Sequence, residues 1–374
     1  KTKTTTTTTT KTTTRTPSES DVYDRQIRLW GAEAQQKIQN SKVLYLHVTG
    51  SSSEALKNLC LAGIKAEICD PRPASALDSS PCFFTHPNNG SGNGNGNGSG
   101  NGNGKEPAPK KTRYESVALA VRPLVEELNP LLGSCPIIDK EISELTKEDL
   151  KDYAVVIASQ VPLVEVVRLS QLVADGSVFY TIDCFGMRGA SMIDFGGGKD
   201  SFRYRPEQGK KLLDPMPIKD YVSLPDMVRV PLHRAINRFH KKGPPPTWVM
   251  YRALMEHQQQ TGHWLGDNSS SSNGNGSSNG NGNANDTDAE IACAKEIVSE
   301  FLQKERVALT DEELNDLLTA GVAQVAPVCA VLGGMVGNEV IKIISGKGEP
   351  ANNTLLLDGR SCKAWTFLVR AKET

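Results

Sequence analysis

The chain has 374 residues and a formal net charge of −1, because 42 Lys and Arg residues offset 43 Asp and Glu residues. This balance excludes a general nucleic-acid-binding protein, which would carry a basic excess. The hydrophobic content of 38% excludes a wholly disordered chain, and no uninterrupted apolar run reaches the roughly 18 residues that span a bilayer, so neither nucleic acid nor a membrane is expected as a partner.

Three tracts of the chain have a low-complexity composition. Residues 1–16 are almost only Thr and Lys, and residues 88–104 and 268–283 contain only Asn, Gly and Ser. Such segments bury too little apolar surface to offset the entropy lost on ordering, so we predict a disordered tail at 1–18 and two disordered inserts. The remaining residues, about 325, suffice for one large or two modest domains. The tail carries no apolar segment of the signal-peptide type, so no secretory leader is expected.

Residues 41–70 have the pattern of a β-α-β unit. The apolar run 43–48 has the length of a strand, and the serines at 51–53 are candidates for the N-cap of the helix that follows. Gly63 is a natural stop for that helix, and residues 64–69 form the second predicted strand.

The alternation of helices and strands continues through the next hundred residues. It predicts, in order, a helix at 116–128, a strand at 153–158, a helix at 162–172 and a strand at 178–183. Strands that alternate with helices in this way predict an α/β fold with a Rossmann-like, doubly wound sheet.

The pattern changes near residue 200. Residues 201–287 are more polar and contain several prolines, and we interpret them as an inserted helical or mixed region between an N-terminal part at 19–200 and a C-terminal part at 288–374. Predicted elements of this half are helices at 248–257, 289–303, 311–318 and 326–344 and strands at 354–358 and 364–369. Gly333 and Gly334 lie inside the apolar helix 326–344, where they would permit close packing.

The first strand-to-helix turn is where a nucleotide phosphate would lie in this fold, and it needs glycines for close backbone approach. Residues 47–53 read His-Val-Thr-Gly-Ser-Ser-Ser, so Gly50 is the single glycine. Asp70 ends the second strand, where an acid often binds ribose, but Arg72 stands where a second acid would help to hold Mg²⁺. We therefore predict a degenerate turn at Gly50 and Asp70 that binds no nucleotide and no metal.

The segment 23–31 precedes the first strand and has helical spacing. Ile27 and Trp30 face one side, whereas Arg25 and Arg28 share another. These arginines have two interpretations, a solvated helix surface or a cationic arm that donates to a phosphate.

The eight cysteines are scattered and form no CxxC pair, which argues against a zinc site and is typical of a reduced intracellular protein with small buried thiols. Cys184 lies at the end of a predicted strand and Cys329 in an apolar helix. We interpret both as buried thiols rather than as nucleophiles.

Several of these segments resemble one enzyme family. Residues 23–31, Tyr-Asp-Arg-Gln-Ile-Arg-Leu-Trp-Gly, resemble the opening signature of the N-terminal adenylation halves of the ubiquitin-like-protein activating enzymes (E1), which have a ThiF/MoeB-type fold. Residues 56–64 are similar to the helix that follows the family's first strand, and residues 183–189 resemble the turn in its sheet, usually written Val-Phe-Gly-x-x-Gly. Residues 326–334, Ala-Pro-Val-Cys-Ala-Val-Leu-Gly-Gly, with 338–342 look like the late helix of the small subunit of the SUMO-activating branch.

This resemblance implies a division of labour between two related halves. One half, the large catalytic subunit, binds ATP and Mg²⁺, adenylates the C-terminal Gly of a SUMO-like modifier and carries the thioester-forming Cys. The other half has lost the nucleotide site and is not active alone, and it completes the partner's site with an arginine in trans. Arg25 matches that arginine, and Arg28 is a second, weaker candidate. The resemblance further implies an obligate heterodimer and residence in the nucleus, with the cytoplasm as the alternative.

Other functions stay open at this stage. The nearest is the regulatory subunit of the NEDD8-activating E1, although its middle domain is usually much longer. A Rossmann-fold, nucleotide-dependent oxidoreductase lacks the glycines that it would need at residues 47–53. A non-enzymatic scaffold without a large-subunit partner is the third.

Overall fold

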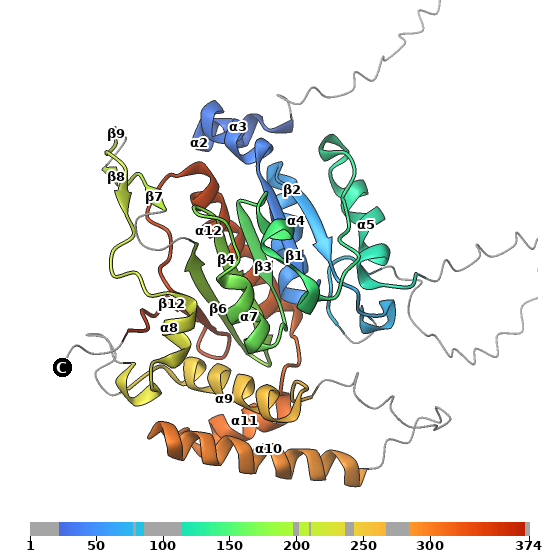
Figure 1. The fold of residues 1–374 in the computed structure, drawn as a ribbon, viewed down its shortest axis with the longest axis vertical. Helices are drawn as coiled ribbons and strands as arrows, with labels where there is room; N and C mark the ends of the chain where they lie inside the picture. Colours follow the sequence, from blue (N-terminus) through green and yellow to red (C-terminus); the bar gives the residue numbers. More distant parts are fainter. Residues whose placement is uncertain are drawn as a thin grey trace, which may run out of the picture.

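The computed structural model describes residues 22–77, 80–85, 114–196, 202–208, 211–235, 243–266 and 284–370. The predicted tail at 1–18, the insert at 88–104 and the tract at 268–283 lie outside the described residues. Figure 1 shows one central sheet with helices on both of its faces.

The sheet within the described residues has eight strands. Its order is β12-β11-β6-β4-β3-β1-β2, with β5 paired to β6. The strands are β1 Lys42–Leu46, β2 Lys65–Cys69, β3 Val155–Ala158, β4 Val178–Thr181, β5 Asp183–Phe185, β6 Arg188–Phe195, β11 Thr354–Asp358 and β12 Lys363–Thr366. Strands β1 to β4 pair in parallel, whereas β6, β11 and β12 extend the sheet in antiparallel pairs. The predicted Rossmann-like, doubly wound α/β fold is confirmed.

The parallel strands are buried on both faces. Val43 and Tyr45 of β1 belong to the core on one side of the sheet, and Leu44 and Leu46 belong to the core on the other. All four side chains are fully buried. A strand covered on both sides needs apolar residues at every position, which explains why these strands appear in the sequence as uninterrupted apolar runs.

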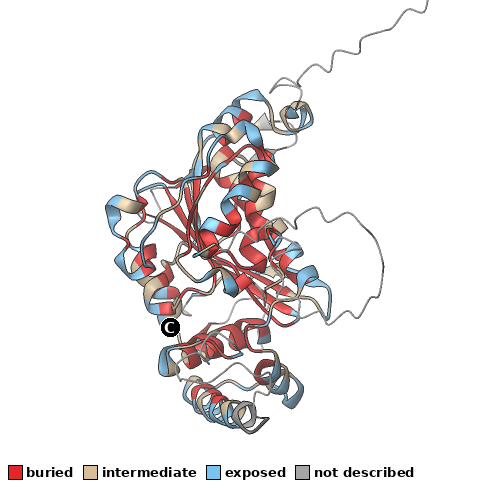
Figure 2. Cartoon of the chain, turned by 90° about the vertical axis from the view of Figure 1, so that its right-hand side faces the viewer, coloured by how far each residue is buried: buried red, intermediate tan, exposed pale blue. Residues whose placement is uncertain are grey.

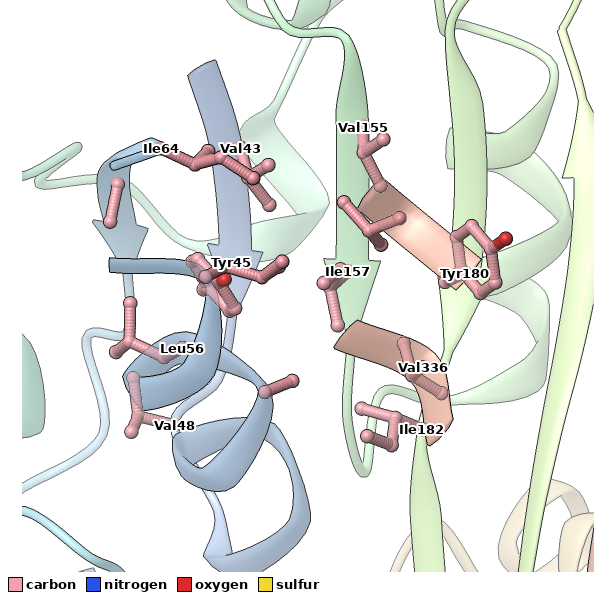
Figure 3. Packing of buried hydrophobic residues seen from close by; sticks show 14 of the residues in the cluster. Val43, Tyr45, Val48, Leu56, Ile64, Val155, Ile157, Tyr180, Ile182 and Val336 are labelled. Carbon is pink, nitrogen blue, oxygen red and sulfur yellow. The ribbon is translucent and has the colours of Figure 1, made fainter. Parts of the chain in front are cut away.

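Each face of the sheet is covered by its own set of helices. One face carries α3 Ala32–Asn40, α4 Gly50–Ala62, α5 Val117–Leu128 and α12 Ala326–Ser345. The other carries α7 Leu163–Ser170, α8 Leu224–Arg229 and α9 Pro246–Thr261, with α10 Ala284–Glu305 and α11 Asp311–Ala320 outside α9. Figure 2 shows that buried residues concentrate in the sheet and on the helix sides that face it. In Figure 3, side chains of β1, β3 and β4 lie in one cluster with Leu56 of α4 and Val336 of α12.

Short elements connect these parts. They are α2 Asp24–Trp30, α6 Lys147–Leu150, η1 Ala74–Leu77, η2 Pro130–Leu132, η3 Ile142–Glu144 and η4 Leu232–Arg234. Two small antiparallel pairs, β7 Arg203–Tyr204 with β10 Met216–Pro217 and β8 Glu207–Gln208 with β9 Lys211–Leu212, lie beyond β6. The helices α8 and α9, from the region interpreted as inserted, share the core on the second face. The domain boundaries themselves stay a prediction.

The structure corrects some predicted boundaries. Helix α4 begins at Gly50 and its N-cap is Thr49 rather than one of the serines at 51–53, because Thr49 and Ser52 form a reciprocal capping box. Gly63 ends the helix in a left-handed conformation with φ of 99°, as predicted. The last strand, β12, ends at Thr366 instead of residue 369.

Strand β6 was not predicted as a strand, although it is buried along its whole length. Its sequence is Arg-Gly-Ala-Ser-Met-Ile-Asp-Phe, in which small and polar residues are mixed with apolar ones. It therefore lacks the uninterrupted apolar run by which the other buried strands were predicted. Cys184 and Cys329 are buried, as predicted, whereas Cys293 and Cys362 are exposed, contrary to the expectation for small buried thiols.

Helix α12 packs unusually closely on α4. A Cβ atom at Gly333 would lie 2.5 Å from Cβ of Glu54 and 2.9 Å from the carbonyl oxygen of Ser51. Gly334 has more room, since its Cβ would meet nothing nearer than Nδ2 of Asn58 at 4.0 Å. The prediction of close packing is therefore confirmed for Gly333.

Helix α12 has 20 residues and a mean hydropathy of 1.5. By length and composition alone, such a helix could cross a membrane. Its sequence is not an uninterrupted apolar run, because Asn338, Glu339 and Lys342 lie within it. In the fold, 56% of its apolar window is buried, and it packs against α4 and the sheet. We therefore describe α12 as a core helix.

Candidate functional site

The position where this fold would bind a nucleotide lies at the carboxyl ends of β1 and β3. These strands are parallel neighbours whose following helices, α4 and α7, cover opposite faces of the sheet. The crevice at such a switch point is the usual ligand site of doubly wound sheets. Residues 47–53 and 159–160 follow the two strands here, so the predicted turn is in the expected place.

A network of buried hydroxyl groups occupies this turn. The Oγ1 atom of Thr49 lies 2.7 Å from Oγ of Ser159, and Oγ of Ser51 donates to the carbonyl of Ile182 at 3.1 Å. The Oγ atom of Ser52 donates to the carbonyl of His47 at 3.0 Å. These hydroxyl groups therefore occupy the turn and are bonded to other groups of the protein. A phosphate bound here would instead require backbone N–H groups that are open to it.

Gly50 is covered by side chains from distant segments. A Cβ atom at this position would lie 2.5 Å from Oε1 of Gln324, 2.9 Å from Cγ of Pro81 and 3.1 Å from Sγ of Cys329. The single glycine of the turn thus allows α4 to pack closely against α12 and the segment 80–85. Side chains from these segments cover the amino end of α4, where a phosphate would otherwise bind.

Asp70 is held by an arginine of its own chain. Its carboxylate accepts from Nε and Nη2 of Arg72 at 2.9 and 2.7 Å, and also from the backbone N–H of Val48 at 2.7 Å. Asp70 is buried, with 1% of its surface exposed. This bidentate pair neutralises the carboxylate and occupies the oxygens that would otherwise bind a ribose.

Asp183 lies at the same edge of the sheet and was not predicted. It accepts hydrogen bonds from the backbone N–H of Gln160 at 2.6 Å and from the hydroxyl of Tyr251. Burial raises the pKa of its carboxyl group to about 6, although these hydrogen bonds oppose the shift. Burial lowers the pKa of His47 to about 4, and the nearby Arg72 acts in the same direction. Asp183 ends a predicted strand just as Asp70 does, which is a local signal for it, whereas only the fold shows that Gln160 and Tyr251 donate to its carboxylate.

Helix α2, which carries the predicted arginines, lies at the opposite edge of the sheet. Figure 1 shows it beside α3, beyond the amino end of β1. Tyr23 is buried and Ile27 and Trp30 are partly buried, whereas Arg25 and Arg28 are exposed. The predicted separation of the apolar and basic sides of this helix is confirmed.

The two arginines differ in their partners. Arg28 forms an i,i+4 ion pair with Asp24, in which Nη2 lies 2.9 Å from Oδ2 and Nε lies 3.2 Å from Oδ1. Arg25 has no hydrogen bond or ion pair with the described part of the chain. Among the described residues no carboxylate would have to be displaced before its guanidinium group binds an external anion, whereas Arg28 would first have to leave Asp24.

The structure separates the predicted site residues into two groups. Gly50 and Asp70 lie near the carboxyl ends of the parallel strands, which form the carboxyl edge of the sheet. Arg25 and Arg28 lie near the amino ends of these strands, at the amino edge. The five residues of β1 alone span about 16 Å between these edges. Arg25 therefore does not serve the turn of its own chain.

Comparisons with known proteins find relatives that match most of the chain. The chain is 26% identical to SUMO-activating enzyme subunit 1 of Dictyostelium discoideum over 351 residues, which cover 92% of the chain and 91% of the relative. It is 26% identical to subunit 1 of Xenopus tropicalis over 366 residues, or 92% and 93% of the two chains. The predicted resemblance to the SUMO-activating enzyme small subunit is confirmed.

The likeness to SUMO-activating enzyme subunit 1 extends to plants. Subunit 1B-1 of Arabidopsis thaliana is 25% identical over 355 residues, which cover 93% of this chain and 95% of that protein. No family model matches the chain. The similarity to subunit 1 proteins therefore rests on pairwise alignments that cover more than nine-tenths of this chain.

Proposed function

We propose that this chain is the non-catalytic subunit of a heterodimeric SUMO-activating enzyme. In this role it supports the ATP-dependent adenylation of a modifier's C-terminal Gly and the transfer of that Gly to a Cys of the large subunit. The observation that carries the proposal is the contrast between the two edges of the sheet. The turn at Gly50 is filled by the chain's own side chains, while Arg25 is exposed and has no hydrogen bond or ion pair with the residues that the structure describes.

In this proposal ATP and Mg²⁺ bind to the large subunit, and Arg25 reaches the ATP phosphates in trans. The attack of the modifier's carboxylate on the α-phosphate releases pyrophosphate and redistributes negative charge over the phosphate oxygens. A guanidinium group placed against those oxygens offsets that charge, and such fixed groups give large rate effects. Arg28 is the weaker candidate because its guanidinium group is already paired with Asp24.

A second subunit also accounts for apolar side chains that the fold leaves exposed. Leu29, next to Arg28 on α2, is 78% exposed, and Val331 on α12 is 51% exposed. The name subunit 1 of the relatives implies a second subunit in their enzymes. We propose that a large catalytic subunit covers this surface in an obligate heterodimer, and that the complex acts in the nucleus.

The test is co-expression with candidate large subunits, followed by measurement of modifier-dependent ATP–pyrophosphate exchange and thioester formation. We expect both activities from the complex with SUMO and neither from the isolated chain, with NEDD8 as the matched control modifier. Calorimetry should detect no binding of ATP·Mg²⁺ to the isolated chain. Tight binding by the isolated chain, or failure of every candidate large subunit to co-purify, would contradict the proposal.

A further inference from the structure

Helix α2 is too short to be stable by itself. It has seven residues, Asp24–Trp30, and none of them is fully buried. Isolated helices shorter than about 12 residues are marginal in water, so the position of this helix depends on what holds its ends. Its exposed Arg25 can act on a partner's substrate only if the helix is fixed.

The amino end and the inner side of α2 are fixed by contacts with neighbouring helices. Tyr23, directly before the helix, is 1% exposed, and its hydroxyl accepts from Nδ2 of Asn129 at 2.9 Å. The side chain of Gln26 donates to the carbonyl of Leu61, at the end of α4, at 3.1 Å. These contacts set one end of the helix against the ends of α4 and α5.

The carboxyl end of α2 is held by a residue more than three hundred positions away. The ammonium group of Lys347 donates to the backbone carbonyl of Trp30, the last residue of the helix. Carbonyls of the last helical turn lack partners within the helix and carry partial negative charge, so a lysine there is doubly favourable. The indole N–H of Trp30 donates to Oε1 of Gln35 at 2.8 Å, which orients the same residue.

The backbone around Lys347 is itself fixed. Gly346 and Gly348 flank it in left-handed conformations, with φ of 67° and 76°. Arg205 pairs with this turn, donating its N–H to the carbonyl of Gly346 at 2.9 Å and accepting from the N–H of Gly348 at 3.0 Å. The glycines permit the tight turn, and the bridge to Arg205 holds it, so Lys347 projects from a rigid support toward α2.

We infer that Lys347 is a positioning residue, which holds α2 so that Arg25 is presented to the partner's nucleotide. This inference rests on the proposed function of Arg25. It does not require Lys347 to touch the substrate. The physical cause is preorganisation of the site, because a displacement of about 1 Å of a group that acts on the reacting atoms lowers the rate up to 100-fold.

The test compares Lys347→Ala with Lys347→Arg in the assembled heterodimer, using ATP–pyrophosphate exchange. We expect Lys347→Ala to lower kcat/KM about tenfold, and Lys347→Arg to recover most of it because the cation is retained. Hydrogen exchange of residues 24–30 should rise only in Lys347→Ala. Lys37→Ala is the matched control, since Lys37 is an exposed lysine of α3 that pairs with Glu33 and does not hold α2.

A double-mutant cycle with Arg25→Ala separates positioning from general damage. If Lys347 acts through Arg25, its removal should change the rate of the Arg25→Ala enzyme less than about twofold. An equal loss in both backgrounds, or a Lys347→Ala enzyme with full activity, would overturn the inference. An Arg25→Ala enzyme with unchanged exchange would instead contradict the proposed function, and the two failures are therefore distinguishable.

Discussion

The two edges of the sheet differ in how their polar groups are satisfied. At the carboxyl edge, Asp70, Ser159 and Asp183 are buried, and each has hydrogen-bond partners within the chain. At the amino edge, α2 exposes Arg25, Arg28 and Leu29 and contributes no fully buried residue of its own. A buried polar group without its partner is costly, whereas an exposed side chain contributes little to stability.

This difference separates stability from function in the molecule. Changes at the carboxyl edge should destabilise the fold. The fraction of the variant that still assembles into heterodimer should keep the adenylation rate per heterodimer of the unaltered chain. Removal of Arg25 from the exposed side of α2 should leave stability unaltered and remove activity.

Gly333→Ala should give the largest loss of stability. Its new Cβ would lie 2.9 Å from the backbone nitrogen of Ala55 and 2.9 Å from the carbonyl of Ser51, so α4 and α12 must move apart. We expect a loss of about 3 kcal/mol in the free energy of unfolding, measured by urea denaturation. Gly334→Ala is the matched control and should gain about 0.5–1 kcal/mol from helix propensity. Equal stabilities of the two variants would show that the close contact is not required.

Asp183→Asn should change how stability depends on pH. The folded-state pKa of about 6 lies above the ordinary aspartate value of 3.8, so the folded chain holds this proton more tightly than the unfolded chain. The resulting stabilisation is complete below pH 3.8 and is lost as the pH rises through about 6. Asp183→Asn should therefore remove about 2 kcal/mol of pH dependence between pH 4 and pH 6.

The measurement for this second prediction is denaturation of both proteins across that pH range. The partly buried Asp149, whose pKa is lowered to about 2 by its hydrogen bonds with Lys140 and Thr146, offers a control because it titrates below the window. A variant at Asp183 with the same slope as the unaltered chain would mean that this carboxyl group is not buried as described.

The sequence was sufficient for the fold class and for the lack of glycines in the turn at 47–53. Fully buried parallel strands such as β3 appear as apolar runs, and the replacement of glycines at 47–53 is local information. The residues that close the turn, among them Pro81 and Gln324, come from distant segments, and nothing in their local sequence indicates where they pack. Lys347 is likewise one lysine between two glycines, and only the fold brings it to Trp30.

The helix α2 arginines illustrate the same limit at the site. Helical spacing predicted that Arg25 and Arg28 share the exposed side, and the structure confirms it. Spacing does not rank the two, because it gives no information about which arginine is paired. The ion pair between Arg28 and Asp24 makes that distinction, and it leaves Arg25 as the group to test.

The central claim is tested most directly by Arg25→Ala in the assembled heterodimer, with Arg28→Ala as the matched control. Arg25 is exposed and forms no hydrogen bond or ion pair with the described residues, so we expect its removal to change stability by less than about 0.5 kcal/mol. We expect modifier-dependent ATP–pyrophosphate exchange to fall by about 100-fold or more in Arg25→Ala, with assembly intact, and to change little in Arg28→Ala. Unchanged exchange in an intact Arg25→Ala heterodimer would contradict the account.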